Sequence, residues 1–272
     1  MKKITTISIL CFTFYNIVSA QPLSHKTEFT HQDSLRGSIF PERAWWDVLR
    51  YDISVEPDFT TKSIKGEVII TYKVVKETKP GEAMQIDLQE PMMISSIEEG
   101  KTKPFFKREG NVYHVLTEGN KPDAVKKIKI QFKGNPRVAV NPPWDGGWIF
   151  TKDAKGRPWM TVACQGLGAS VWYPCKDHQS DEPDNGASLS ITAPDSLVAV
   201  GNGRLVEKKS NSKGKTTWKW EVKNPINNYT IIPYIGNYVN WTEEYAGEKG
   251  NLDCSYWVMD YNLEKAKNIL CR

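Results

Sequence analysis

The chain has 272 residues, of which 39% are hydrophobic and 25% charged, and its formal net charge at pH 7 is +4. Basic and acidic residues are interspersed along the chain, so neither nucleic acid nor an anionic membrane surface is the expected partner. A chain of this length can bury a large core in one large domain or two small ones.

The first twenty residues have the features of an export signal. Lys2 and Lys3 precede an apolar run from residue 4 to residue 18, and Val18-Ser19-Ala20 has the small-x-small form of a cleavage site. The run is too short and too often interrupted by polar residues to span a bilayer as a helix. We expect cleavage after Ala20, export to the periplasm or the exterior, no stable membrane anchor, and a lead segment at residues 21–42.

Period-two alternation of polar and apolar residues dominates the rest of the chain and is typical of strands with one solvated face. Ten Trp and eleven Tyr also suit broad sheets. We therefore predict a mainly β fold, either a large antiparallel β-sandwich or a saddle-shaped sheet. Strands are expected near residues 51–55, 64–75, 83–89, 111–117, 125–132, 187–193, 197–207, 218–222, 229–239 and 252–259.

Two stretches depart from this alternation. Residues 135–159 are rich in Pro, Gly and Trp and are expected to form a long loop, which in a compact domain is often functional. From Leu263 on, apolar residues recur at helical spacing after a possible cap at Asp260 or Asn262. This predicts a short helix over residues 260–272, which is marginal by itself and should pack against a further domain.

The cysteines leave several states open. Beyond the signal the chain carries Cys164, Cys175, Cys254 and Cys271, and an exported protein could pair four cysteines in three ways that the sequence does not distinguish. The spacing of Cys164 and Cys175 allows a disulfide across a turn. Buried free thiols are the alternative.

Residues 160–184, MTVACQGLGASVWYPCKDHQSDEPD, gather side chains that often carry chemistry. Zinc sites usually take at least two His or Cys ligands at fixed spacing, and the four histidines of this chain include no His-x-x-x-His pair. Pro183 interrupts an EF-type calcium loop, and no cysteine-hydrolase signature surrounds Cys164 or Cys175. We therefore predict no catalytic residue and no metal ligand here, and interpret the acidic residues around His178 as a turn in which side chains bind the backbone.

Gln165 is the residue of this stretch that favours substrate contact. It ends a strand-like run immediately before a Gly-Leu-Gly turn. A neutral amide can accept a hydrogen bond from an ammonium group and donate one to a carbonyl at the same time. The alternative is a glutamine that satisfies the backbone of its own loop.

Several motifs in a fixed order resemble the N-terminal β-domain of the M1 family of zinc aminopeptidases. They are RYDISVEPD, KGEVIITYKV, Cys164-Gln165-Gly166, Tyr173-Pro174-Cys175-Lys176-Asp177, Glu182-Pro183, and NPINNYTIIPYIGNYVNW from residue 224 to 241. The resemblance covers residues 43–272, and the spacing from Gln165 to Pro174 is similar to that of the leukotriene A4 hydrolase and cold-active aminopeptidase branch. The sequence departs from the pattern at Ser170, where many relatives carry Arg, and in the acidic DHQSDEPDNG stretch.

The resemblance implies a β-domain over residues 43–259, followed by a linker helix that enters a thermolysin-like catalytic domain missing after Arg272. That domain would bind zinc through HExxH and a downstream Glu, so the intact protein would be an exported aminopeptidase and this chain alone inactive. Of the family's site residues, Gln165, with the adjacent Gly166, maps onto this chain as a contact for the α-amino group or first carbonyl of a peptide substrate.

A second hypothesis belongs to another functional class. A stand-alone exported β-sandwich could bind glycan or protein through exposed Trp144, Trp148 and Trp159. The C-terminal helix favours the peptidase interpretation, because a finished binding module would end in a strand or a capped element.

Overall fold

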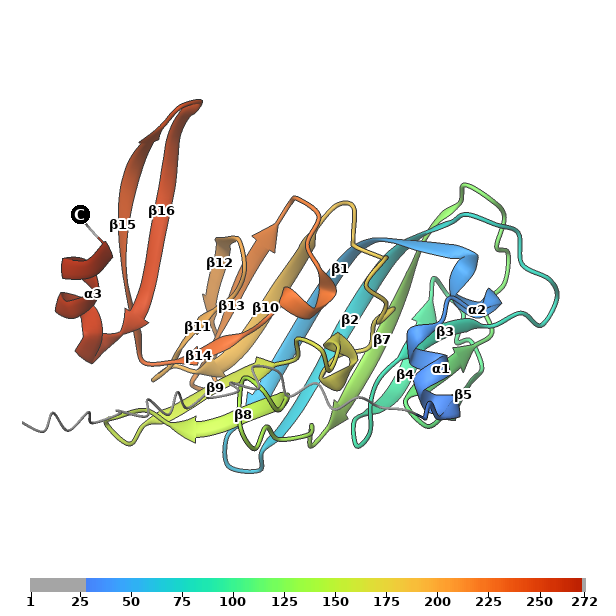
Figure 1. The fold of residues 1–272 in the computed structure, drawn as a ribbon, viewed down its shortest axis with the longest axis horizontal. Helices are drawn as coiled ribbons and strands as arrows, with labels where there is room; N and C mark the ends of the chain where they lie inside the picture. The colour runs from blue at the N-terminus through green and yellow to red at the C-terminus, as the bar shows by residue number, and fades with distance from the viewer. Residues whose placement is uncertain (1–27, 271–272) are drawn as a thin grey trace, which may run out of the picture. The chain divides into compact units, whose positions relative to one another are not determined.

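A computed structural model describes residues 28–270 of the chain. The expected signal, its cleavage site and Cys271 lie outside these residues. In the described part, no helix has the length and apolar character needed to cross a membrane. Strands dominate it, and a short helix stands near its C-terminal end (Figure 1), so the predicted mainly β fold is confirmed.

The largest sheet has seven strands in the order β12-β13-β10-β1-β2-β7-β4. All of its neighbouring strands are antiparallel except β1 and β10, which run parallel. The prediction of an antiparallel sheet is wrong at this pair, because period-two alternation shows which face of a strand is buried and not its direction. The strands are β12 (Arg204–Ser210), β13 (Lys215–Val222), β10 (Ala187–Pro194), β1 (Trp46–Asp58), β2 (Ser63–Val74), β7 (Val125–Gly134) and β4 (Met93–Glu99).

The core of this sheet follows from the alternation in the sequence. The register places Ile53 of β1 opposite Val68 of β2, and Val68 opposite Ile130 of β7. All three side chains are buried. The charged residue that directly precedes each of them on its own strand points to the other face. Such a row of apolar residues across three strands stabilises the sheet through burial of apolar surface.

The remaining strands of the described part form three smaller sheets. A four-stranded sheet contains β11 (Val198–Val200), β14 (Tyr234–Gly236), β9 (Pro158–Ala163) and β8 (Gly147–Lys152). A three-stranded sheet contains β3 (Met84–Asp87), β6 (Val112–Val115) and β5 (Phe106–Glu109). The hairpin β15 (Tyr238–Gly247) and β16 (Gly250–Met259) pairs only within itself.

These sheets correct three of the sequence predictions. Residues 147–152 form strand β8, so the expected loop over residues 135–159 is wrong there; the strand is short and framed by Gly and Pro. The strand expected at 197–207 is divided between β11 and β12, which belong to different sheets. The strand expected at 229–239 is likewise divided between β14 and β15, after a 3-10 turn η2 (Asn228–Thr230).

Short helices complete the described part. The predicted C-terminal helix is confirmed as α3 (Leu263–Leu270), preceded by the 3-10 turn η3 (Asp260–Asn262). Arg157, after the β8–β9 turn, donates to Asp260 from Nη1 at 2.9 Å and from Nη2 at 2.5 Å, which fastens the start of α3 to the four-stranded sheet. The helix α1 (His31–Gly37) lies in the expected lead segment, and α2 (Pro41–Ala44) crosses its end at residue 42. Neither helix was predicted, because both are too short for a periodic signal.

Candidate functional site

The Gln165 turn, residues 164–168, follows directly after β9. The Gly168 N–H donates to the Cys164 carbonyl at 2.7 Å and closes the turn. Gly166 and Gly168 have φ angles of 77° and 95°, a left-handed backbone that glycine adopts without steric cost. The Gly-Leu-Gly sequence is therefore what allows so tight a turn at the end of a strand.

Gln165 itself is exposed, and its side chain makes no hydrogen bond to any other residue between 28 and 270. The alternative of a glutamine that satisfies its own loop is thus not what the structure shows. The oxygen acceptor and the NH₂ donors of its amide are therefore free to bind an external group. This geometry is suited to contact with an external group, and the substrate role of Gln165 and Gly166 stays a prediction.

Side chains from two distant segments hold the carbonyls that follow Gln165. Arg36 of α1 donates from Nη2 to the Gly166 carbonyl at 2.8 Å. Gln89 donates from Nε2 to the Leu167 carbonyl at 2.8 Å and to Ser170 Oγ at 3.0 Å. Sequence reasoning missed Arg36 and Gln89, because they lie 130 and 78 residues from their carbonyl partners.

A buried carboxylate, Asp177, supports the far side of the turn. It accepts hydrogen bonds from the N–H groups of Ala169 and Ser170, each at 3.3 Å, and from Ser170 Oγ at 2.5 Å. Burial raises the pKa of Asp177, the bonds from Ser170 oppose this, and the nearby Asp87 raises the pKa further. A Cβ at Gly168 would overlap the Asp177 carboxylate, so this position has room for glycine alone.

Ser170 is where the sequence departs from the resembled pattern. It stands in the 3-10 turn η1 (Ala169–Val171) with 2% of its surface exposed. Its small hydroxyl fits between Asp177 and Gln89 and bonds to both. The residue is therefore part of the support of the turn.

In the acidic segment around His178, the described side chains bind one another and the backbone. Lys176 and Asp181 form a buried ion pair, and Asp181 Oδ1 accepts the Val48 N–H at 3.3 Å. His178 Nδ1 hydrogen-bonds Ser180 Oγ at 2.7 Å. In the described residues, no group of three or more His, Cys, Asp or Glu side chains is arranged to hold a metal ion.

The two thiols of the segment are free, and they are protonated at neutral pH. Cys164 and Cys175 are both buried and unpaired, so of the two alternatives the structure has free thiols. Burial raises the pKa of Cys164 to about 12, and raises that of Cys175 as well. Since the thiolate is the nucleophile, neither group suits covalent catalysis at neutral pH.

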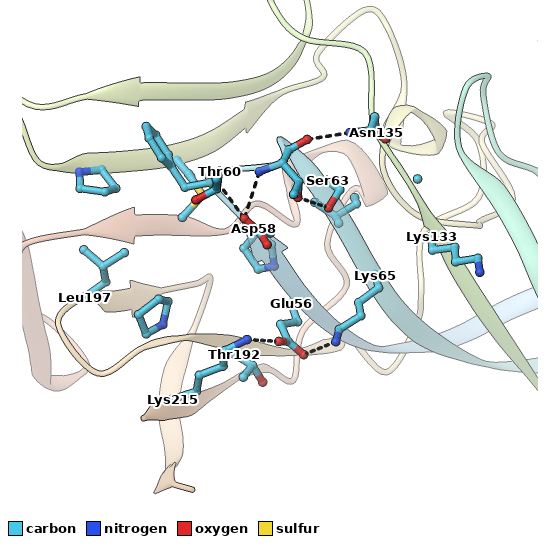
Figure 2. Close-up of a pocket in the computed structure, with 18 of the residues that line it drawn as sticks. Glu56, Asp58, Thr60, Ser63, Lys65, Lys133, Asn135, Thr192, Leu197 and Lys215 are labelled. Atoms are coloured by element: carbon cyan, nitrogen blue, oxygen red, sulfur yellow. Dashed lines mark hydrogen bonds and ion pairs between the residues drawn. The ribbon is translucent and has the colours of Figure 1, made fainter. Parts of the chain in front are cut away.

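A cavity of about 820 Å³ lies at the other end of β9, away from the Gln165 turn. Its two carboxylates already have partners (Figure 2): Glu56 pairs with Lys65 at 3.1 Å and also with Lys215, and Asp58 accepts the N–H groups of its own turn. Binding sites need polar groups that converge on a ligand. With its carboxylates satisfied internally, this cavity offers no chemistry to the candidate site.

The tryptophans of the second hypothesis do not form one exposed face. Trp144 is 79% exposed, but Trp148 is fully buried and packs edge-to-face on Trp172. Trp159 is partly buried and donates from Nε1 to the Tyr238 hydroxyl at 2.7 Å. The expectation of three exposed tryptophans is wrong, because β8 and β9 turn these residues into the packing of the four-stranded sheet.

A comparison with protein-family models decides the family. The model of the peptidase M1 N-terminal domain matches residues 48–230. The chain belongs to the peptidase M1 N-terminal domain family. In this M1 domain the match includes the Gln165 turn and Asp177, whereas α1 and α2 precede it. No curated protein sequence matches the chain significantly.

Solved structures agree with the M1 assignment. An M1 zinc metallopeptidase variant from Deinococcus radiodurans, bound to a Tyr-Ser-Ala substrate, has a TM-score of 0.67 and 18% identity, over 80% of this chain and 49% of that one. Native leukotriene A4 hydrolase from Saccharomyces cerevisiae has a TM-score of 0.63 and 18% identity, over 82% of this chain and 33% of its own. At this identity the likeness establishes the fold, and the chain spans about half of the first protein and a third of the second.

Proposed function

We propose that this M1 N-terminal domain forms one wall of the substrate cleft of an exported zinc aminopeptidase, which removes N-terminal residues from peptides. The observation that carries the proposal is Gln165, an exposed amide without a hydrogen-bond partner in the described residues, on a turn held rigidly from two sides. The Deinococcus relative of the same fold was solved with a tripeptide substrate, which supports a peptide as the ligand.

Gln165 would act by binding and orientation. Its amide oxygen can accept from the ammonium group of a peptide N-terminus while its NH₂ donates to the first carbonyl. Holding both groups at once fixes how far the peptide enters the cleft, which is what an enzyme that removes one residue at a time requires. A neutral amide adds no charge, so the countercharge for the ammonium would come from carboxylates of the other domain.

Zinc belongs to the proposed whole enzyme. The described residues do not fit the ion, because residues 28–270 contain no cluster of three or more of its usual ligands. We propose that a catalytic domain following residue 272 holds it, and that the 272-residue chain alone has no peptidase activity. Export is proposed from the composition of residues 1–20.

The gene itself provides the first test. The DNA after codon 272, read in all three forward frames, is expected to encode HExxH and a later Glu within a continuous catalytic domain. The protein made from that longer reading frame should cleave leucyl anilide and lose this activity on zinc chelation, whereas the 272-residue chain should not cleave it. Several hundred downstream codons without the motif, or zinc-dependent cleavage by the 272-residue chain, would contradict the proposal.

A further inference from the structure

Residues 31–44, which contain α1 and α2, lie outside the residues that match the M1 family model, yet α1 contacts the Gln165 turn. Arg36 of α1 donates to the Gly166 carbonyl at 2.8 Å. This carbonyl belongs to the residue directly after Gln165. The contact therefore acts on the backbone next to the side chain proposed to bind substrate.

Buried side chains fix the backbone from which Arg36 reaches out. Gln85 donates from Nε2 to the Leu35 carbonyl at 2.9 Å, and the Leu35 side chain is buried. Arg43 donates from Nη1 to the carbonyls of Arg36 at 2.6 Å and Ser38 at 3.0 Å. The Arg36 side chain is exposed, but the backbone that carries it is fixed by these hydrogen bonds.

The other supports act on later parts of the turn. Gln89 binds the Leu167 carbonyl, and Asp177 binds the N–H groups of Ala169 and Ser170. Gly166 has φ at 77° and no heavy atom within 4 Å of the position where a Cβ would stand. Glycine has more accessible backbone conformations than other residues, so the bond from Arg36 restrains this peptide in addition to the Gly168–Cys164 bond that closes the turn.

We propose that Arg36 is a positioning residue for Gln165, and that the lead segment is in this way part of the substrate site. Without the guanidinium, the Gly166 peptide would sample more orientations, and the Gln165 amide would face the cleft for less of the time. A peptide N-terminus would then bind more weakly, with little effect on the bond-breaking step. The kinetic part of this inference depends on the proposed function, whereas the ordering of the turn does not.

Amide hydrogen exchange of the 272-residue chain tests the ordering. In Arg36→Ala, the Gly168 N–H, which closes the turn, should exchange roughly three- to tenfold faster, because a hydrogen bond from a charged group is lost. Arg36→Lys should recover part of the protection, since an ammonium can also donate to the carbonyl. Arg50→Ala is the matched control, because Arg50 also donates to a carbonyl, that of Asn185 at 3.0 Å, away from the turn.

Kinetics of the full-length enzyme test the coupling to Gln165. Arg36→Ala should raise KM for leucyl anilide with kcat nearly unchanged. In the Arg36→Ala/Gln165→Ala double variant, the Arg36 substitution should add no further rise, because Arg36 acts through Gln165. A purely structural role would instead give additive losses.

Each outcome decides the proposal. Exchange of the Gly168 amide at the wild-type rate in Arg36→Ala, or fully additive kinetics in the double variant, would overturn it. Should Arg36→Ala fail to fold, Arg36→Gln, which keeps an uncharged donor on a shorter stem, takes its place in both measurements. If Gln165→Ala alone leaves the kinetics unchanged, the proposed role of Gln165 fails, and the exchange experiment still decides whether Arg36 orders the turn.

Discussion

The carboxylate of Asp87 accepts the main-chain N–H of Asp177 at 2.8 Å. The same Asp87 oxygen binds Nη2 of Arg43 at 2.6 Å, and Arg43 and Asp87 are both buried. Asp177 in turn holds the N–H groups after the Gln165 turn. One series of charged contacts therefore links α2, strand β3 and the candidate site in the core of the domain.

Arg43→Met should be strongly destabilising, because it leaves the Asp87 carboxylate buried without its cation. Breaking such a pair typically costs about 3–5 kcal/mol of unfolding free energy. Guanidinium unfolding of the 272-residue chain measures it. Arg204→Met is the control: the Arg204–Asp253 pair is about 70% exposed on both sides, and its loss should cost less than about 1 kcal/mol. Similar losses in the two variants would show that the buried pair is not a key support.

Gly168→Ala and Gly166→Ala compare two glycines of one turn. Both have positive φ, and a residue other than glycine in such sparsely populated backbone regions costs about 1–3 kcal/mol. At Gly168 the added Cβ also overlaps the Asp177 carboxylate, whereas at Gly166 it meets no atom within 4 Å. We expect the unfolding free energy, measured by chemical denaturation, to fall by about 1–3 kcal/mol more in Gly168→Ala than in Gly166→Ala. Equal losses would mean that Asp177 moves away without cost.

Asp177→Asn should change how stability depends on pH. The folded-state pKa of Asp177 is raised, chiefly by burial, so its contribution to stability is full below the unfolded pKa near 3.9 and is lost as pH rises through the folded pKa. Asparagine stays neutral. The unfolding free energy of the variant should therefore rise relative to that of the wild type from about pH 4 upward, by about 1.4 kcal/mol for each unit by which the pKa is raised.

Asp58→Asn is the control of opposite sign for this pH series. The N–H groups of Thr61 and Thr60 lower the pKa of Asp58, so its contribution is present above the unfolded pKa and is lost as pH falls through the folded pKa. The unfolding free energy of the wild type should therefore increase relative to that of Asp58→Asn as pH rises. Guanidinium unfolding from pH 3 to pH 7 separates the two trends, and a flat difference for Asp177→Asn would contradict the burial argument.

Gln165→Ala should weaken substrate binding in the full-length enzyme. Losing a hydrogen bond to an ammonium group corresponds to roughly a 10- to 100-fold fall in kcat/KM for leucyl anilide. Gln131→Ala, an exposed glutamine of β7 in the large sheet, should leave the kinetics unchanged. Wild-type kinetics for Gln165→Ala would remove this residue from the site.

Local patterns in the sequence predict much of the fold. Alternation in β1, β2 and β7 marks their buried faces, and the register confirms that Ile53, Val68 and Ile130 share one face. Helical spacing after Asn262 predicts α3. The Gly-Leu-Gly sequence indicates the turn that exposes Gln165. Each of these features depends on residues within a few positions of one another, so the sequence carries the signal directly.

What only the tertiary structure decides is which distant residues hold that turn. The parallel pairing of β1 with β10 requires a crossover, and neither strand encodes its neighbour. Arg36 meets Gly166 across 130 residues, and Asp87 meets Asp177 across 90. A lone Arg or Asp has no periodicity, and its partner is set by how the sheets pack. The sequence by itself therefore determines that Gln165 stands in a glycine turn, and the packing of α1 and β3 determines that this turn is held in one orientation.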